Sequence, residues 1–191
     1  MTRPALQNRL CDAAESQLVV VDIQTRLAGA MQAEDRIRVI RNAGMLIQAA
    51  GLLDIPLIAS EQYPRGLGPT EEEVAWHFPK TLEAVEKTCF ACSGEPAFSE
   101  ALNRNGKRQV ILAGMEAHVC VLQTAMELQA DGYAVFVVED AICSRNESHR
   151  RNALERLRQA GVVVTNVESV LFEWIRDAHH GQFKAVSALV R

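Results

Sequence analysis

The chain has 191 residues, 48% of them hydrophobic, which is enough for a packed core and excludes an intrinsically disordered protein. The formal net charge of −4 and the pI of about 5.8 favour neither a nucleic-acid partner nor an anionic membrane surface. No apolar run approaches the roughly 20 residues of a spanning helix, and the N-terminal segment lacks a signal-peptide core, so we expect a cytoplasmic protein.

Apolar runs and amphipathic repeats alternate along the first half of the chain. The expected elements are a strand at 17–24, a helix at 34–50, a strand at 54–62, a short strand at 83–90 and a helix from Pro96 to Gly106. Gly51 is the expected end of the first helix. Residues 63–80 contain three prolines and two glycines and predict a long loop, which in a compact domain is usually functional or disordered.

The second half continues the alternation. We expect a strand at 109–114, a helix at about 118–130, a strand at 133–142, a helix at 147–161, and a sixth strand and a last helix within 162–178. This pattern is typical of an α/β fold in which helices cover both faces of a parallel sheet. Its ligand site lies outside the carboxyl ends of the strands.

Cys120 lies near that edge, at the expected start of the helix that follows the strand at 109–114. The partial positive charge of a helix N-terminus lowers the pKa of a thiol and favours the nucleophilic thiolate. Backbone N–H groups of the same turn are suited to bind an oxyanion. The alternative is structural, because a free cysteine often packs as a small apolar side chain.

Asp22 and Lys87 are expected at the same edge. Asp22 follows four apolar residues and is either a general base or a hydrogen-bond acceptor for the next segment. Lys87 is either an ordinary surface lysine or a cation that stabilises a thiolate and a carboxylate. A cysteine, a base and a cation together fit nucleophilic acyl transfer.

The five cysteines are scattered and odd in number, which argues against a disulfide framework. Cys89 and Cys92 form a C-x-x-C pair, which leaves a thiol redox protein as an alternative function. A zinc site would need a second pair of ligands, and no histidine has a suitable spacing to the pair. The segment after the first strand has no glycine-rich phosphate fingerprint, so dinucleotide binding is not expected.

Three segments, "VVVDIQ", "EKTCFACSG" and "LAGMEAHVCVLQTAMELQADGYAVFVVEDAICSR", resemble the isochorismatase-like cysteine hydrolases. The resemblance covers about residues 17–177 and points to the branch of isochorismatase domain-containing proteins and bacterial hydrolases of unassigned substrate. It implies a three-layer Rossmann-like fold with a six-stranded parallel sheet in the order 3-2-1-4-5-6. We therefore expect one domain over 1–191, with a core at 17–177 and a C-terminal tail at 178–191.

The resemblance also implies a triad of Asp22, Lys87 and Cys120. In this reading Asp22 accepts the thiol proton, Lys87 balances charge, and Cys120 attacks an amide or related carbonyl to form a thioester. A cis peptide bond is implied between Met115 and Glu116. The backbone N–H groups of Glu116 and Cys120 would then form the oxyanion hole.

Two differences between this sequence and other branches of the family narrow the expected activity. The segment "SEQYPRGLGPT" lacks the metal ligands of the nicotinamidase branch, so no metal and no cofactor are expected. Cys120 argues against isochorismatase activity itself, because that subgroup lacks the nucleophilic cysteine. We therefore expect a metal-independent hydrolase of a small molecule, although a catalytically silent binding protein of the same fold stays open. By position, substrate contacts are expected from Gln62, Tyr63, Phe90 and His118.

The resemblance implies a homo-oligomer, as a dimer, a tetramer or a larger assembly. The segment "HFPKT" at 77–81 and the C-terminal tail are the candidate contact regions, and the alternative for the tail is that it packs on its own domain.

Overall fold

A computed structural model describes residues 10–191, and residues 1–9 of the expected domain lie outside this range. The sheet has the order β3-β2-β1-β4-β5-β6, and every neighbouring pair is parallel, which confirms the predicted topology. The strands are β1 (Ser16–Val21), β2 (Leu57–Gln62), β3 (Val85–Lys87), β4 (Gln109–Met115), β5 (Ala134–Cys143) and β6 (Val163–Thr165).

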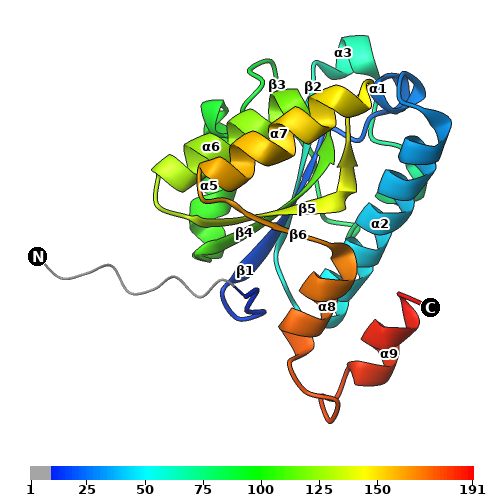
Figure 1. The fold of residues 1–191 in the computed structure, drawn as a ribbon, viewed down its shortest axis with the longest axis vertical. Coiled ribbons are helices and arrows are strands. Elements are labelled where there is room, and N and C mark those ends of the chain that lie inside the picture. The colour runs from blue at the N-terminus through cyan, green and yellow to red at the C-terminus, as the bar shows by residue number, and fades with distance from the viewer. Residues whose placement is uncertain (1–9) are drawn as a thin grey trace, which may run out of the picture.

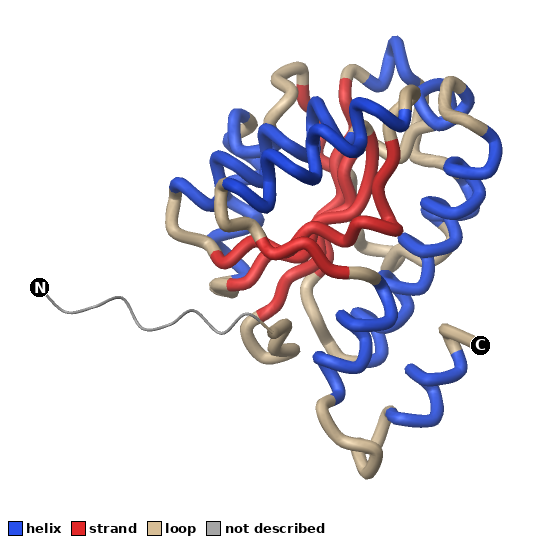
Figure 2. The backbone as a smooth tube through the Cα atoms, in the orientation of Figure 1, coloured by secondary structure: helices blue, strands red, loops and turns tan. Residues whose placement is uncertain are grey.

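Helices cover both faces of the sheet (Figures 1 and 2). One layer holds α2 (Ala33–Leu52), α8 (Val167–Ile175) and α9 (Phe183–Ala188), and the other holds α5 (Pro96–Asn105), α6 (Leu122–Ala130) and α7 (Glu147–Gln159). Successive residues of β1 face opposite layers, with Leu18 and Val20 in the first core and Val19 and Val21 in the second. A strand buried on both faces is continuously apolar, as "LVVV" shows.

The segment expected to be a loop at 63–80 contains two short helices, α3 (Pro64–Leu67) and α4 (Glu72–Ala75). Arg36 of α2 bonds to the carboxylate of Glu71 at 2.7 Å, and the backbone N–H of Glu71 donates to the carbonyl of Ile23 at 2.8 Å. These bonds fix α4 against α2 and against the segment after β1. That segment forms a further short helix, α1 (Thr25–Gly29), which the apolar pattern does not reveal.

Among the helix ends that differ from the prediction, two are informative. The helix α2 continues through Gly51 to Leu52, because Leu52 and Leu53 pack on the core and hold the chain in place. The helix expected from about His118 begins instead with a π-helical turn, η2 (Ala117–Val121), and α6 follows it. The C-terminal tail packs on its own chain, where Val186 of α9 is fully buried.

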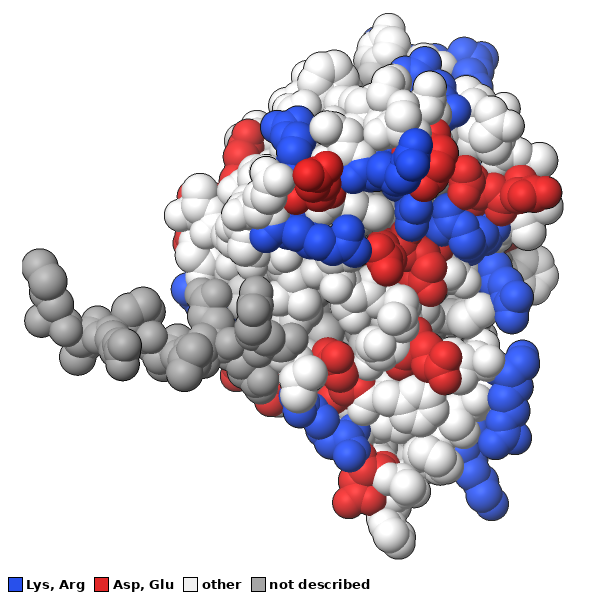
Figure 3. Space-filling view, in the orientation of Figure 1, with Lys and Arg blue, Asp and Glu red and all other residues white. Residues whose placement is uncertain are grey.

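The surface mixes charges of both signs, and Figure 3 shows basic and acidic side chains interspersed over the visible face. Within residues 10–191, no helix combines the length and the hydropathy that crossing a membrane requires.

Gly114 allows β4 and β1 to approach closely at the edge where β4 ends. Its φ is +133°, and a Cβ at this position would lie 2.0 Å from the carbonyl oxygen of Val21. Only glycine combines this backbone conformation with so close an approach. The turn that leads to Cys120 therefore depends on the missing side chain.

We predict that Gly114→Ala lowers the free energy of unfolding by about 2–4 kcal/mol, through clash and backbone strain. Gly51→Ala is the matched control, because nothing lies within 4 Å of its Cβ position. In a helix this change should raise stability by roughly 0.5–1 kcal/mol. Urea unfolding measures both, and equal midpoints for the two variants would contradict the prediction.

Candidate active site

The carboxyl ends of β1, β2 and β3 meet at one edge of the sheet. In the register Val21 pairs with Ser60, and Gln62 pairs with Lys87. Asp22 follows β1 directly and has a φ of +50°. For a residue other than glycine this conformation costs roughly 1–3 kcal/mol and clusters at functional sites. The strand register thus brings Asp22 and Lys87 together, although 65 positions separate them in the chain.

A buried ion pair joins these two residues. The Nζ of Lys87 lies 2.7 Å from Oδ2 of Asp22, and neither side chain has exposed surface. The ammonium group also donates to Oε1 of Gln62 at 2.8 Å and to the carbonyls of Cys89 and Phe90 at 3.3 and 3.1 Å. Burial acts to lower the pKa of Lys87, but the Asp22 carboxylate and two nearby thiols together raise it above its usual value. Lys87 is therefore charged at neutral pH.

Cys120 completes the cluster from η2. The residue is 5% exposed, and its thiol is hydrogen-bonded to Asp22. Burial and then the charge of Asp22 raise the pKa of the thiol, while Lys87 acts in the opposite direction. The direction is opposite to the one predicted from the helix start, because burial and a nearby carboxylate outweigh the helix dipole. In the resting protein the cluster holds a neutral thiol.

Two residues that sequence reasoning missed extend this cluster. The hydroxyl of Ser60 donates to Oδ1 of Asp22 at 2.8 Å, and the thiol of Cys92 donates to the Ser60 oxygen at 3.4 Å. Both residues are buried. Asp22 therefore has a different partner on each oxygen, Ser60 on Oδ1 and Lys87 on Oδ2. The Cys92 position in a C-x-x-C pair suggested redox or metal chemistry, and no sequence signal marked Ser60.

The two thiols of the C-x-x-C pair have different surroundings. Cys92 is fully buried against Ser60, and its backbone N–H donates to the hydroxyl of Thr124 at 2.9 Å. Cys89 is partly exposed and its sulfur packs close to Gly94. All five cysteines are free thiols in the structure.

The four residues expected to contact substrate lie in different environments. Gln62 belongs to the cluster through Lys87. Tyr63 and Phe90 are 56% and 53% exposed, and Tyr63 lines a hollow of about 320 Å³ whose wall includes Lys87. His118 is turned toward other partners: its Nδ1 lies 2.9 Å from the hydroxyl of Ser144, and its ring lies 4.6 Å from the ring of His149 at an angle of 40°.

The segment between β4 and η2 contains a cis peptide bond between Met115 and Glu116. The Glu116 side chain is 7% exposed, and its Oε1 accepts from the backbone N–H and from Nε of Arg145, both at 3.0 Å. These bonds tie the segment that carries Cys120 to the residues that follow β5. Across residues 10–191, no three histidine, cysteine or acidic side chains gather as a metal site.

A family model, the isochorismatase domain, matches residues 16–169. The chain belongs to the isochorismatase domain family. A zebrafish (Danio rerio) protein named isochorismatase domain-containing protein 2 is 41% identical over 152 residues, which cover 80% of this chain and 76% of that protein. This agrees with the resemblance seen in the sequence.

Solved structures place the family fold over nearly the whole chain. A Caenorhabditis elegans protein described as MAR1 ribonuclease is 34% identical with a TM-score of 0.88, covering 95% of this chain and 92% of that chain. The Escherichia coli YcaC protein, described as an octameric hydrolase of unknown specificity, is 26% identical with a TM-score of 0.87, covering 98% and 91%. This isochorismatase family chain therefore has a hydrolase among its near structural relatives.

We predict that Asp22→Asn lowers the pKa of the Cys120 thiol. The charge of Asp22 raises this pKa more than Lys87 lowers it, so loss of the carboxylate favours the thiolate even if Lys87 loses its own charge. Alkylation of Cys120 by iodoacetamide, followed by peptide mass mapping, should begin at a lower pH than in the wild-type protein. Asp131→Asn, an exposed carboxylate beyond α6, is the charge-matched control. An unchanged or higher alkylation pH in Asp22→Asn would contradict the prediction.

Proposed function

We propose that this isochorismatase family protein is a cysteine hydrolase of small amides or related acyl compounds. The observation that carries the proposal is the buried contact of the Asp22–Lys87 ion pair with the Cys120 thiol. A charged pair with no exposed surface is costly, and it adds little to stability that an apolar pair would not. A thiol, a base and a fixed cation are, however, what nucleophilic acyl transfer requires.

In the proposed reaction the resting thiol loses its proton only as it attacks. Asp22 accepts the proton while Sγ of Cys120 bonds to the carbonyl carbon, and the carbonyl π electrons move to oxygen. The backbone N–H groups of Glu116 and Cys120 are the proposed donors to this oxyanion. When the C–N bond breaks, Asp22 returns the proton to the leaving amine and a thioester remains.

The second half of the proposed reaction repeats the first with water. Asp22 removes a proton from water as the water oxygen attacks the thioester. When the C–S bond breaks, Asp22 returns this proton to Sγ of Cys120, which regenerates the thiol and the carboxylate and releases the acid. Lys87 stays protonated throughout, because its four acceptors all face it. Its role is to orient Asp22 and to limit the charge that accumulates.

We infer further that the protein is a homo-oligomer, a proposal that the octameric state described for YcaC supports. The substrate we propose is a small molecule and not RNA, despite the ribonuclease described from C. elegans. A net charge of −4 does not favour RNA binding, and the face shown in Figure 3 carries interspersed charges of both signs.

We predict that Cys120→Ala removes turnover in a screen of small amides, esters and RNA oligonucleotides, without loss of folding by circular dichroism. Cys143→Ala is the matched control: Cys143 is also buried, and the charged groups around it are other than Asp22 and Lys87. Intact-mass analysis of a rapidly quenched reaction should show an acyl adduct on wild-type protein and none on Cys120→Ala. Full activity of Cys120→Ala on any substrate that the wild type hydrolyses would refute the proposal.

Experiments on the same protein also test the two alternative functions, a thiol redox protein and a catalytically silent binding protein. A redox protein would form a Cys89–Cys92 disulfide under mild oxidation and lose reductase activity in Cys89→Ser. A silent binding protein would retain a ligand in this site and hydrolyse nothing in the screen. RNA cleavage that depends on Cys120 would contradict the proposed small-molecule substrate, but it would still support Cys120 as the nucleophile.

A further inference from the structure

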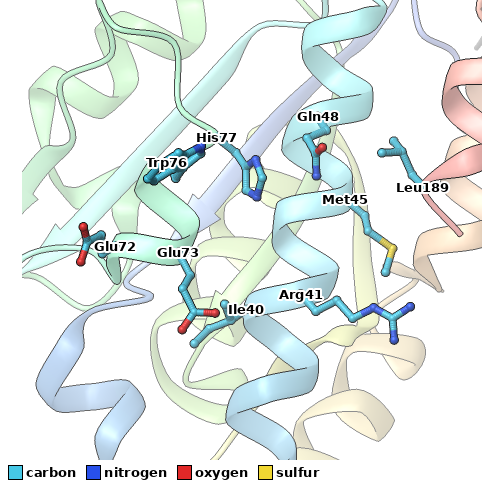
Figure 4. Close-up of a pocket in the computed structure, with 9 residues that line it drawn as sticks. All are labelled: Ile40, Arg41, Met45, Gln48, Glu72, Glu73, Trp76, His77 and Leu189. Carbon is cyan, nitrogen blue, oxygen red and sulfur yellow. The ribbon is translucent and has the colours of Figure 1, made fainter.

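A second feature lies on the helix layer of α2, outside the Asp22–Lys87–Cys120 cluster. A groove of about 660 Å³ runs over α2 beside α4, and Figure 4 shows its lining. Its walls are Met45 and Gln48 of α2, Trp76 and His77 after α4, and Leu189 after α9. None of these side chains belongs to the catalytic cluster. The groove therefore has no role in the proposed reaction.

The rim of this groove exposes large apolar side chains. Trp76 is 82% exposed and Ile37 is 67% exposed. Ile37 lies one helical turn before Arg41, so it extends the same face of α2. By contrast Trp174, the other tryptophan of the chain, is 3% exposed. Large apolar side chains exposed beside a hollow are typical of a protein interaction site.

The charges of the groove are divided between its two sides. Arg41 extends from α2, and Glu72 and Glu73 extend from α4 (Figure 4). Within residues 10–191, none of these three side chains forms an ion pair. A surface with a basic side and an acidic side is complementary to itself when a two-fold axis sets each side against its opposite.

We propose that the face formed by α2 and α4 binds the same face of a second copy of this chain. Trp76 of each copy enters the groove of the other, and Arg41 of each meets Glu72 and Glu73 of the other. The inference rests on the homo-oligomer proposed above and assigns it a contact surface. Of the regions expected to make contacts, it uses the start of "HFPKT" and the end of the tail, through His77 and Leu189.

Trp76, the proposed anchor of the interface, supplies part of the area that a stable interface needs. One tryptophan buries about 150–250 Å², whereas a standard interface buries about 800 Å² on each partner. The anchor therefore needs the neighbouring surface of α2, which the exposed Ile37 and Arg41 supply. The bonds of Glu71 to Arg36 and Ile23 hold α4 in position, so the surface is formed before association. A pre-formed surface avoids the cost of ordering a loop on binding.

Sedimentation velocity over a wide range of protein concentration tests the proposal. Wild-type protein should be a dimer or a larger assembly. Trp76→Glu and Arg41→Glu should each raise the apparent dissociation constant at least tenfold. Arg41→Glu/Glu72→Arg/Glu73→Arg should recover association, because each charge again meets its opposite across the axis. Arg151→Glu on α7, in the opposite helix layer, is the matched charge reversal and should not change association.

Tryptophan fluorescence gives a second readout, which reports the exposure of Trp76 directly. Trp174 is buried, so a neutral quencher such as succinimide reports Trp76. The wild-type assembly should resist quenching, and dissociated Arg41→Glu should be quenched readily. Assembly that survives both single variants, with Trp76 freely quenched, would refute this interface and leave the oligomer in place. A wild-type monomer at every concentration would refute both, and neither result bears on the role of Cys120.

Discussion

The ion pair between Lys87 and Asp22 is the constraint around which the carboxyl edge of the sheet is built. Two opposite charges with no exposed surface are tolerated only when their remaining hydrogen-bonding capacity is filled. Gln62 and two backbone carbonyls fill that of the ammonium group, and Ser60 fills that of the carboxylate. The ends of β2 and β3 and the chain beyond β3 thus all supply hydrogen-bond partners to the ion pair. A site so thoroughly bonded is rigid before any substrate arrives.

The topology of the parallel sheet brings these residues together. Its strands end at a common edge, and their order places β1 between β2 and β4. Asp22 therefore faces Lys87 on one side and the turn carrying Cys120 on the other. The close approach of Gly114 to Val21 sets the second of these distances. Glu116 and Arg145 then anchor that turn to the chain beyond β5. The position of the Cys120 thiol therefore depends on the chain that follows β1, β4 and β5.

The strand and helix order was predictable because each buried strand is a continuous apolar run and each helix has a regular apolar face. Asp22, Lys87 and Cys120 were predictable because they stand at strand ends, where such a sheet binds ligands. Ser60 and Cys92 were not, since their contacts depend on the exact register of β2 and on the path after β3. The short helices α3 and α4 were not predicted, because a segment of four residues is too short to show a helical periodicity. The pKa direction at Cys120 was wrong because burial is a tertiary property.

The raised thiol pKa is consistent with catalysis once the proton acceptor is considered. A free thiolate in this cluster would face the Asp22 carboxylate, and their repulsion is what raises the pKa. In the proposed reaction, attack on a carbonyl removes that cost, because the sulfur charge moves to the carbonyl oxygen as Asp22 takes the proton. Lys87 contacts Oδ2 of Asp22 and holds the carboxylate in position. On this proposal the base and the nucleophile become active together, and a neutral thiol at rest also resists adventitious alkylation and oxidation.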